Sequence, residues 1–196
     1  MTSKSAIRAR KAILPDVPAI HALIAGCARE GLVLPRTIAE LCENVRDFTV
    51  AEKHGEIIGC GALHLYGGHL AEVRSIVVAR NAQGQGAGRK LVAALLSESR
   101  QHKVAQVCLF TRSPRYFGRL GFVEVPHASL PDKIFKDCRN CPMFNNCDET
   151  AMVYAGVAAR DAEVDTRDIE AILRPAHPPQ QEKRGLAGDP GARMPS

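Results

Sequence analysis

The chain has 196 residues, of which 45% are hydrophobic, and it carries a formal charge of +5. This length and composition suffice for one globular domain with a hydrophobic core. The mild charge is spread along the chain without a basic block, which argues against a nucleic-acid-binding module. Seven cysteines, an odd number, favour free thiols in a reducing compartment over a disulfide framework. With no signal-peptide core and no apolar run of membrane-spanning length, we expect a cytoplasmic protein.

The order of predicted elements indicates one α/β (α+β) domain with a mixed sheet. Asp16 is expected to cap a first helix that ends at Gly31, and Thr37 is expected to cap a short second helix that reaches Val45. Three consecutive strands follow, which excludes a regular alternation of strand and helix. The predicted strands are residues 7–12, 48–52, 57–65, 72–78, 104–111, 122–125 and 149–154, with further helices at 88–102 and 114–120. The buried face of helix 88–102 is expected to hold Leu91, Val92, Leu95 and Leu96.

The composition changes near the C-terminus. We expect the folded domain to span residues 1–158, because the segment that follows is rich in proline, glycine and charge. Such a segment has little apolar surface to bury, so residues 159–196 are predicted to be a disordered tail.

Three glycines at alternate positions separate a predicted strand from the helix that follows it. Gly84, Gly86 and Gly88 allow a ligand to approach the backbone, and the helix N-terminus supplies unpaired N–H groups, which together favour a phosphate. A P-loop is excluded because no hydroxyl residue follows Lys90. A dinucleotide-binding turn is excluded because the spacing is G-x-G-x-G and the residue twenty past Gly88 is Cys108, not an acid. A purely structural glycine turn is the remaining alternative.

The stretch "QGQGAG", between the strand "SIVV" and the helix "RKLVAALL", resembles the Q/R-x-x-G-x-G/A signature of the GNAT superfamily of acetyl-CoA-dependent N-acyltransferases. The resemblance runs to about Tyr154 and implies a mixed, mostly antiparallel central sheet flanked by helices. It also implies acetyl-CoA as co-substrate, with pantetheine paired along the preceding strand and an arginine near the phosphates. The residues that would contact coenzyme A are Ile76, Val77, Val78, Gln83, Gly84, Gln85, Gly86, Ala87, Gly88 and Arg89.

Acetyl transfer to an amine requires a base, an oxyanion donor and a proton for the leaving thiolate. Glu72 opens the strand beside the expected cofactor and is the candidate base, with a surface carboxylate as the alternative. The oxyanion would meet a backbone N–H near Val77 or Val78. Family members often use a tyrosine in Y-x-x-x-G-F as the acid, but "RYFGRLGF" has Phe117 at that position. Tyr116, one residue earlier, or solvent would then supply the proton.

Several further stretches, including "GLVLPRT", "LAEVRSIVV", "LPDKIFKDC" and "CDETAMVY", resemble short bacterial N-acetylglutamate synthases. These enzymes acetylate the α-amine of L-glutamate at the start of arginine biosynthesis. A dicarboxylate needs cationic partners, for which Arg36, Arg74 and Lys133 are the candidates. A solvated surface charge is the alternative for each, and it is our preferred interpretation of Lys133. The alternative functions are acetylation of glutamine, another amino acid, a polyamine or a protein, and a coenzyme A-binding regulator without catalysis.

Three cysteines, Cys138, Cys141 and Cys147, form a C-x-x-C-x5-C pattern. Zinc usually takes four ligands from two such units, and only one C-x-x-C is present, so we predict free or redox-sensitive thiols and no metal. The expected partners are a small amino-acid substrate and, by resemblance, a second copy of the chain in a homodimer. Nucleic acid and membrane are not expected.

Overall fold

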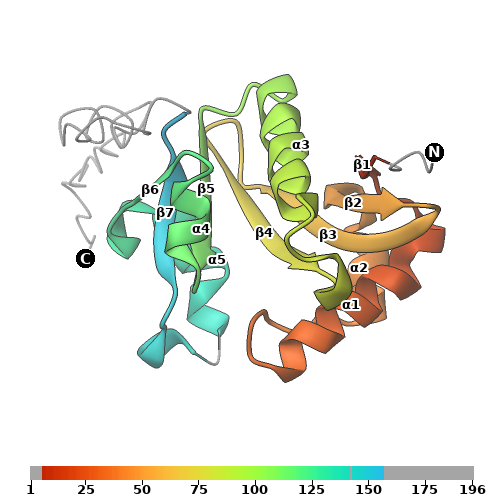
Figure 1. Ribbon diagram of the computed structural model, residues 1–196. Coiled ribbons are helices and arrows are strands. Elements are labelled where there is room, and N and C mark those ends of the chain that lie inside the picture. Colours follow the sequence, from red (N-terminus) through yellow and green to blue (C-terminus); the bar gives the residue numbers. More distant parts are fainter. Residues whose placement is uncertain (1–5, 142, 157–196) are drawn as a thin grey trace, which may run out of the picture.

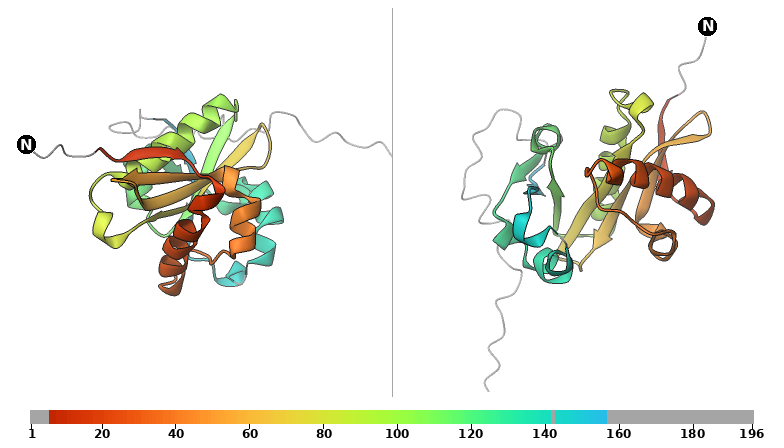
Figure 2. Two further views of the ribbon diagram at one scale, coloured as in Figure 1. Left: turned by 90° about the vertical axis from the view of Figure 1, so that its right-hand side faces the viewer. Right: turned by 90° about the horizontal axis from the view of Figure 1, so that it is seen from below.

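A computed structural model describes residues 6–141 and 143–156, and the predicted tail at 159–196 lies outside these residues. A seven-stranded sheet in the order β1-β2-β3-β4-β5-β7-β6 forms the centre of the molecule, with helices on both faces (Figures 1 and 2). All strand pairs are antiparallel except β4 with β5. The expected mixed, mostly antiparallel sheet flanked by helices is therefore confirmed.

The strands are β1 (Arg8–Lys11), β2 (Phe48–Lys53), β3 (Glu56–Leu65), β4 (Leu70–Val78), β5 (Gln106–Thr111), β6 (Phe122–Glu124) and β7 (Thr150–Tyr154). The helices are α1 (Val17–Arg29), α2 (Ile38–Glu43), α3 (Ala87–Gln101), α4 (Pro114–Gly118) and α5 (Pro131–Lys136), and short 3-10 turns connect several elements. All the predicted strands and helices are present, and α5 is the helix that the sequence analysis did not anticipate.

Three local predictions need correction. The Asp16 side chain does not cap α1, because its carboxylate accepts hydrogen bonds from Arg10 at 2.6 and 3.0 Å. Val45 lies in a 3-10 turn after α2. Strand β4 begins at Leu70, so Glu72 is its third residue and does not open it. The predicted Thr37 cap is confirmed, since its hydroxyl accepts the Glu40 N–H in a capping box.

The two faces of the sheet carry separate hydrophobic clusters. Helix α3 buries Leu91, Val92, Leu95 and Leu96 against one face, as its sequence predicted. Helices α1 and α2 pack residues such as Ile20, Ile24 and Leu41 against the opposite face. Because both faces of β3 and β4 are covered, these strands are held rigidly in the middle of the molecule.

The strands β4 and β5 pair over only three residues. The parallel register joins Leu70–Gln106, Ala71–Val107 and Glu72–Cys108 and goes no further. Beyond this point the two strands diverge, and within the described chain residues 73–78 have no strand partner on the β5 side (Figure 1). The backbone of β4 is therefore available to a ligand at the centre of the sheet.

Candidate active site

The glycine loop, residues 83–88, leads from the end of β4 into the N-terminus of α3. Gly84 and Gly86 have φ of 74° and 89°, and Gly86 is the N-cap residue of α3. Nothing lies within 4 Å of where a Cβ on either glycine would be, so the space beside the backbone is open. The first N–H groups of a 15-residue helix have no intrahelical acceptors. The loop therefore has the geometry of a phosphate site.

Strand β4 carries a bulge where it pairs with β3. Ala62 pairs with Arg74 and Cys60 pairs with Val77, so β4 has one residue more than β3 between these two pairs. In this extra length of β4, Ser75 adopts φ of 54°. Ala79 donates its N–H to Ile58 on β3 at 2.8 Å. Because N–H groups alternate in direction along a strand, Val77 also faces β3, and Val78 faces the free edge. Of the two predicted oxyanion donors, Val78 is the one whose N–H points toward the opening.

Tyr116 lies in α4 against the start of α3. A methyl group added at Gly88 would lie 2.5 Å from the Tyr116 hydroxyl, so the hydroxyl lies close against the backbone at this glycine. Burial raises the pKa of Tyr116, against the opposing charges of Arg119 and Arg89. Phe117, at the position where the family pattern has tyrosine, is buried in the core beneath α3. The hydroxyl group is thus next to the glycine loop.

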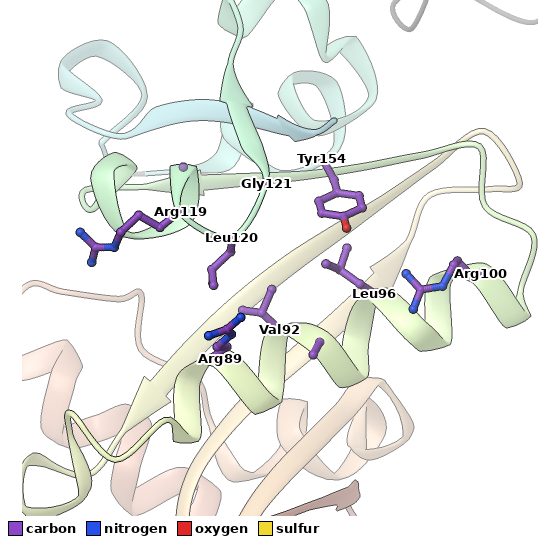
Figure 3. A pocket seen from close by; sticks show the side chains of 10 residues that line it. Arg89, Val92, Leu96, Arg100, Arg119, Leu120, Gly121 and Tyr154 are labelled. Carbon is purple, nitrogen blue, oxygen red and sulfur yellow. The ribbon is translucent and has the colours of Figure 1, made fainter. Parts of the chain in front are cut away.

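A groove runs between α3 and the segment from α4 to β6 (Figure 3). This α3–α4 groove has a volume of about 220 Å³, and no acidic side chain is found among the described residues that line it. Arg89 and Arg119 lie at one end of the groove and Arg100 at the other, with Val92 and Leu120 between them. Arg89 belongs to the first turn of α3, so the groove adjoins the glycine loop and extends its positive potential.

Glu72 is buried, with 3% of its side chain exposed, which rules out the surface-carboxylate alternative. Its oxygens lie 2.9 and 3.1 Å from the Lys133 ammonium, and one of them accepts the Tyr66 hydroxyl at 2.9 Å. Arg74 lies 3.8 Å from the same oxygen. Asp137 lies 3.2 Å from Lys133 and 2.7 Å from the Tyr66 hydroxyl. We call these five residues the charged cluster.

Lys133 is not a solvated surface charge, contrary to our preferred interpretation, because only 15% of its side chain is exposed. Burial alone would lower the pKa of Lys133, but the carboxylates of Glu72 and Asp137 raise it above its ordinary value. For Asp137, burial is outweighed by the Tyr66 hydrogen bond and the Lys133 charge, which hold the pKa below its usual range. Burial, together with the two carboxylates, raises the pKa of Tyr66 far above that of a free phenol.

A cavity of about 190 Å³ adjoins the charged cluster on the face of the sheet opposite α3. We call it the α5 cavity. Arg112, after β5, ties two loops of this region together, with bonds of 2.8 Å to Asp148 and to the Gly31 carbonyl. The residues that line the cavity are Leu34, Phe110, His127, Lys133, Ile134, Asp137, Cys138, Cys141, Met143, Phe144, Cys147 and Glu149.

The structure brings Glu72, Arg74 and Lys133 together, but Arg36 is not part of this group. Arg36 is half-buried and lies two residues past Leu34 in the loop before α2, without itself lining the cavity. Tyr66, Asp137 and Glu149 were not predicted from the sequence. Asp137 follows Lys133 by four residues, a helical spacing that the proline at the start of α5 could have revealed. No local pattern marks Tyr66 or Glu149.

Cys138, Cys141 and Cys147 are free thiols that all line the α5 cavity. Within residues 6–141 and 143–156, no three His, Cys, Asp or Glu side chains are arranged to hold a metal ion. In the same residues, no helix is both long enough and apolar enough to cross a membrane.

Comparisons with known proteins agree with this geometry. Residues 44–124 match the family model of the acetyltransferase (GNAT) domain. An uncharacterized N-acetyltransferase of Chlorobaculum tepidum is 39% identical over 144 residues, which cover 74% of this chain and 93% of the relative. The chain belongs to the GNAT acetyltransferases. An amino-acid acetyltransferase of Mycobacterium tuberculosis is 33% identical over 67% of this chain and 77% of its own length.

Two solved structures with similar folds add detail. A Mycobacterium tuberculosis protein in complex with CoA and NLQ superposes with a TM-score of 0.66 and 27% identity, over 75% of this chain and 98% of that one. N-acetylglutamate synthase from Neisseria gonorrhoeae, complexed with coenzyme A and N-acetyl-glutamate, superposes with a TM-score of 0.69 and 25% identity. That match covers 78% of this chain and 35% of the larger protein.

The chain is thus an acetyl-CoA-dependent N-acetyltransferase, and its residues fit the co-substrate. The glycine loop leaves open space for a pyrophosphate beside the α3 N-terminus, and the unpaired edge of β4 offers backbone groups to an extended pantetheine chain.

Proposed function

We propose that this chain is an amino-acid N-acetyltransferase that acetylates the α-amine of L-glutamate, the first step of arginine biosynthesis. The observation that carries the proposal is the α5 cavity beside the charged cluster, where fixed cations lie near the unpaired edge of β4. Its volume suits a small molecule and not a folded protein partner. The names of the relatives support the same substrate class.

The cations of the charged cluster are the proposed anchors for the substrate carboxylates. Arg74 and Lys133 lie within 4 Å of carboxylate oxygens already, so this position accommodates such groups. Arg36 would close over the substrate from the loop before α2, because Leu34 of that loop lines the cavity. A substrate carboxylate would then take the place of Asp137 beside these cations.

On the other side of β4, the chain would bind and orient acetyl-CoA, whose thioester supplies the activated acetyl group. The amides of residues 83–88 would hold the pyrophosphate, and Ile76–Val78 would hold the pantetheine. Arg89 and Arg119 would attract the remaining phosphate through the α3–α4 groove. The Val78 N–H would donate to the carbonyl oxygen as negative charge develops on it.

Proton transfer to the leaving thiolate has two candidate sources. Tyr116 stays the predicted donor, although its hydroxyl lies against Gly88 at the glycine loop. A water molecule in the opening between β4 and β5 is the alternative. A Tyr116→Phe variant distinguishes them, since loss of a proton donor lowers kcat whereas loss of a phosphate contact raises KM for acetyl-CoA.

The test is thiol release from acetyl-CoA by the full chain with glutamate, glutamine, aspartate, lysine or spermine. The proposal predicts release with glutamate that is largely lost in Arg36→Ala and retained in the exposed control Arg46→Ala. Release with cationic amines alone would contradict it and favour a polyamine substrate, for which the acidic Glu149 in the cavity provides a reason. Coenzyme A binding without release for any amine would indicate a regulator.

A further inference from the structure

The acceptor amine of an amino acid is mostly protonated at neutral pH, so one of the chain's groups must remove a proton before the amine attacks. An effective base faces the acceptor, has an unoccupied lone pair and has a pKa near the working pH. Three carboxylates lie at or beside the α5 cavity, and they differ in these properties.

Glu72 does not meet these requirements in the ligand-free chain. Both of its oxygens contact the Lys133 ammonium, and one also accepts the Tyr66 hydroxyl. With 3% of the side chain exposed, it has almost no surface from which to reach the acceptor. Asp137 contacts Lys133 and Tyr66 through one oxygen, Oδ2, and these contacts hold its pKa below the ordinary value, which makes it a weaker base. The geometry of both carboxylates suits fixing the cluster's cations.

Glu149 has the opposite environment. It immediately precedes β7 and lines the α5 cavity together with Phe110 and Lys133. Its side chain is half-buried, and it has no hydrogen bond or ion pair with any of the residues described. Among the described residues that line the cavity, Glu149 is thus the carboxylate that has both oxygens free to meet a ligand, whereas Asp137 has one oxygen bound by Lys133 and Tyr66.

The surroundings of Glu149 favour its protonated form more than water does. Burial raises the pKa of Glu149 above its ordinary value, and the charges of Arg112 and Lys133 oppose this only in part. A raised pKa moves a carboxyl group toward the range in which a general base works near neutral pH. The titratable and charged groups around it are Glu72 on β4, Arg112 after β5, His127 in the turn before α5, Lys133 and Asp137 at α5, and Asp148, Cys138, Cys141 and Cys147 in the loop before β7.

We infer that Glu149, and not the predicted Glu72, is the base that accepts the proton of the acceptor's ammonium group. The inference rests on the proposed function. The ammonium gives one proton to Glu149, and the neutral nitrogen forms a bond to the acetyl carbon while the carbon–sulfur bond breaks. The nitrogen's second proton ends on the departing thiolate, directly or through water. The products are an amide and a thiol, and Glu149 returns its proton to solvent. Glu72 is then a positioning residue that holds Lys133 and Tyr66.

The experiment compares Glu149→Gln with wild type in steady-state thiol release across pH 4 to 10, using the acceptor that wild type prefers. We expect kcat to fall about 100-fold or more near neutral pH, the usual contribution of a general base. In wild type the rate should fall on the acid side of the profile as Glu149 becomes protonated. In the variant the rate should no longer level off above that pH but should keep rising about tenfold per pH unit, because bulk solvent now deprotonates the acceptor.

Three controls separate this role from a structural one. Asp148→Asn disturbs the same loop by breaking the Arg112 pair but removes no carboxylate from the cavity, so its pH profile should keep the wild-type shape. Glu149→Asp should recover part of the activity. An acceptor analogue with an aminooxy group in place of the α-amine is uncharged near neutral pH, so Glu149→Gln should cost far less with it.

Two results would overturn the inference. One is wild-type kcat and an unchanged pH profile in Glu149→Gln together with a rate that keeps rising with pH in Glu72→Gln, which would make Glu72 the base. The other is an equal loss in Glu149→Gln for the amine and the aminooxy acceptor with a lowered melting temperature, which would show a structural role. Failure of wild type to acetylate any amino acid would instead contradict the proposed function, and this is seen before any variant is made.

Discussion

The two sides of the β4–β5 opening are built differently. On the α3 side, a single stretch of six residues forms the proposed phosphate site, because glycine conformation and the helix N-terminus are local properties. On the α5 side, Tyr66 and Asp137 are 71 positions apart in sequence, and Glu72 and Lys133 are 61 apart. A local site depends on backbone geometry, whereas an assembled site depends on burial and the pairing of charges. Substitutions should therefore affect the two sides in different ways.

The largest expected effect on stability is on the α5 side, where the site is assembled from residues far apart in the sequence. Lys133→Met leaves the Glu72 carboxylate buried without its ammonium partner, which should lower the free energy of unfolding by about 3–5 kcal/mol. Urea denaturation followed by circular dichroism measures it. The double variant Glu72→Gln/Lys133→Met should recover much of the loss, and Lys103→Met on the surface should be nearly neutral. A loss below about 1 kcal/mol for Lys133→Met would show that the pair is solvated.

The same difference between neighbouring and distant residues explains which parts of the two sites could be predicted from the sequence. The strand, the glycine loop and the amphipathic face of α3 could be predicted, since each depends on neighbours within a few residues. Glu72 was predicted to be the base from its place beside the expected cofactor, but its burial was not foreseen. That burial depends on α5, whose short helical segment has too few turns to show a clear period. Nothing near Glu149 in sequence predicts that it lines a cavity.

A smaller effect on stability is expected from Tyr66, which also lies on the α5 side. Tyr66→Phe removes a hydroxyl that contacts two carboxylates, and we expect a loss of about 1.5–3 kcal/mol in the free energy of unfolding. The pH dependence should change too. Folding raises the pKa of both Tyr66 and Lys133, so their stabilisation is present at neutral pH and is lost as the pH rises beyond about 10. Asp137, whose pKa is lowered, stabilises at neutral pH and loses its contribution as the pH falls below about 4.

Urea denaturation midpoints measured from pH 3 to 11 check both the alkaline and the acid loss of stability. The variant Tyr66→Phe should have a weaker alkaline loss than wild type, while Asp137→Asn should weaken the acid loss. An identical alkaline profile for wild type and Tyr66→Phe would mean that the buried phenol is not coupled to folding.

On the α3 side, Gly86→Val should act mainly on cofactor binding. Gly86 has φ of 89°, a conformation that costs a branched residue about 1–2 kcal/mol, and the added side chain would project beside the phosphate site. We expect at least a tenfold weaker affinity for coenzyme A by titration calorimetry, with the pH dependence of unfolding unchanged. Gly26→Ala in α1, where the added methyl group meets nothing within 4 Å, is the control. Unchanged affinity in Gly86→Val would contradict the phosphate assignment.

The smallest effect is expected in the α3–α4 groove. Arg119→Ala should raise KM for acetyl-CoA about two- to threefold at low salt and less at high salt, because an exposed cation acts through a screened field. Arg100 lies about 16 Å along α3 from Arg89, at the other end of the groove, so Arg100→Ala should change KM less. An equal effect of the two variants would indicate general attraction along the groove instead of a phosphate contact at the Arg119 end.

The most direct test of the account is a crystal structure of the full chain with coenzyme A and an N-acetylated amino acid. The account predicts pyrophosphate oxygens within hydrogen-bonding distance of the amides of residues 83–88, pantetheine along the free edge of β4, and the acetylated product in the α5 cavity between Lys133 and Glu149. A product bound on the α3 face, or an empty α5 cavity with the product elsewhere, would contradict it.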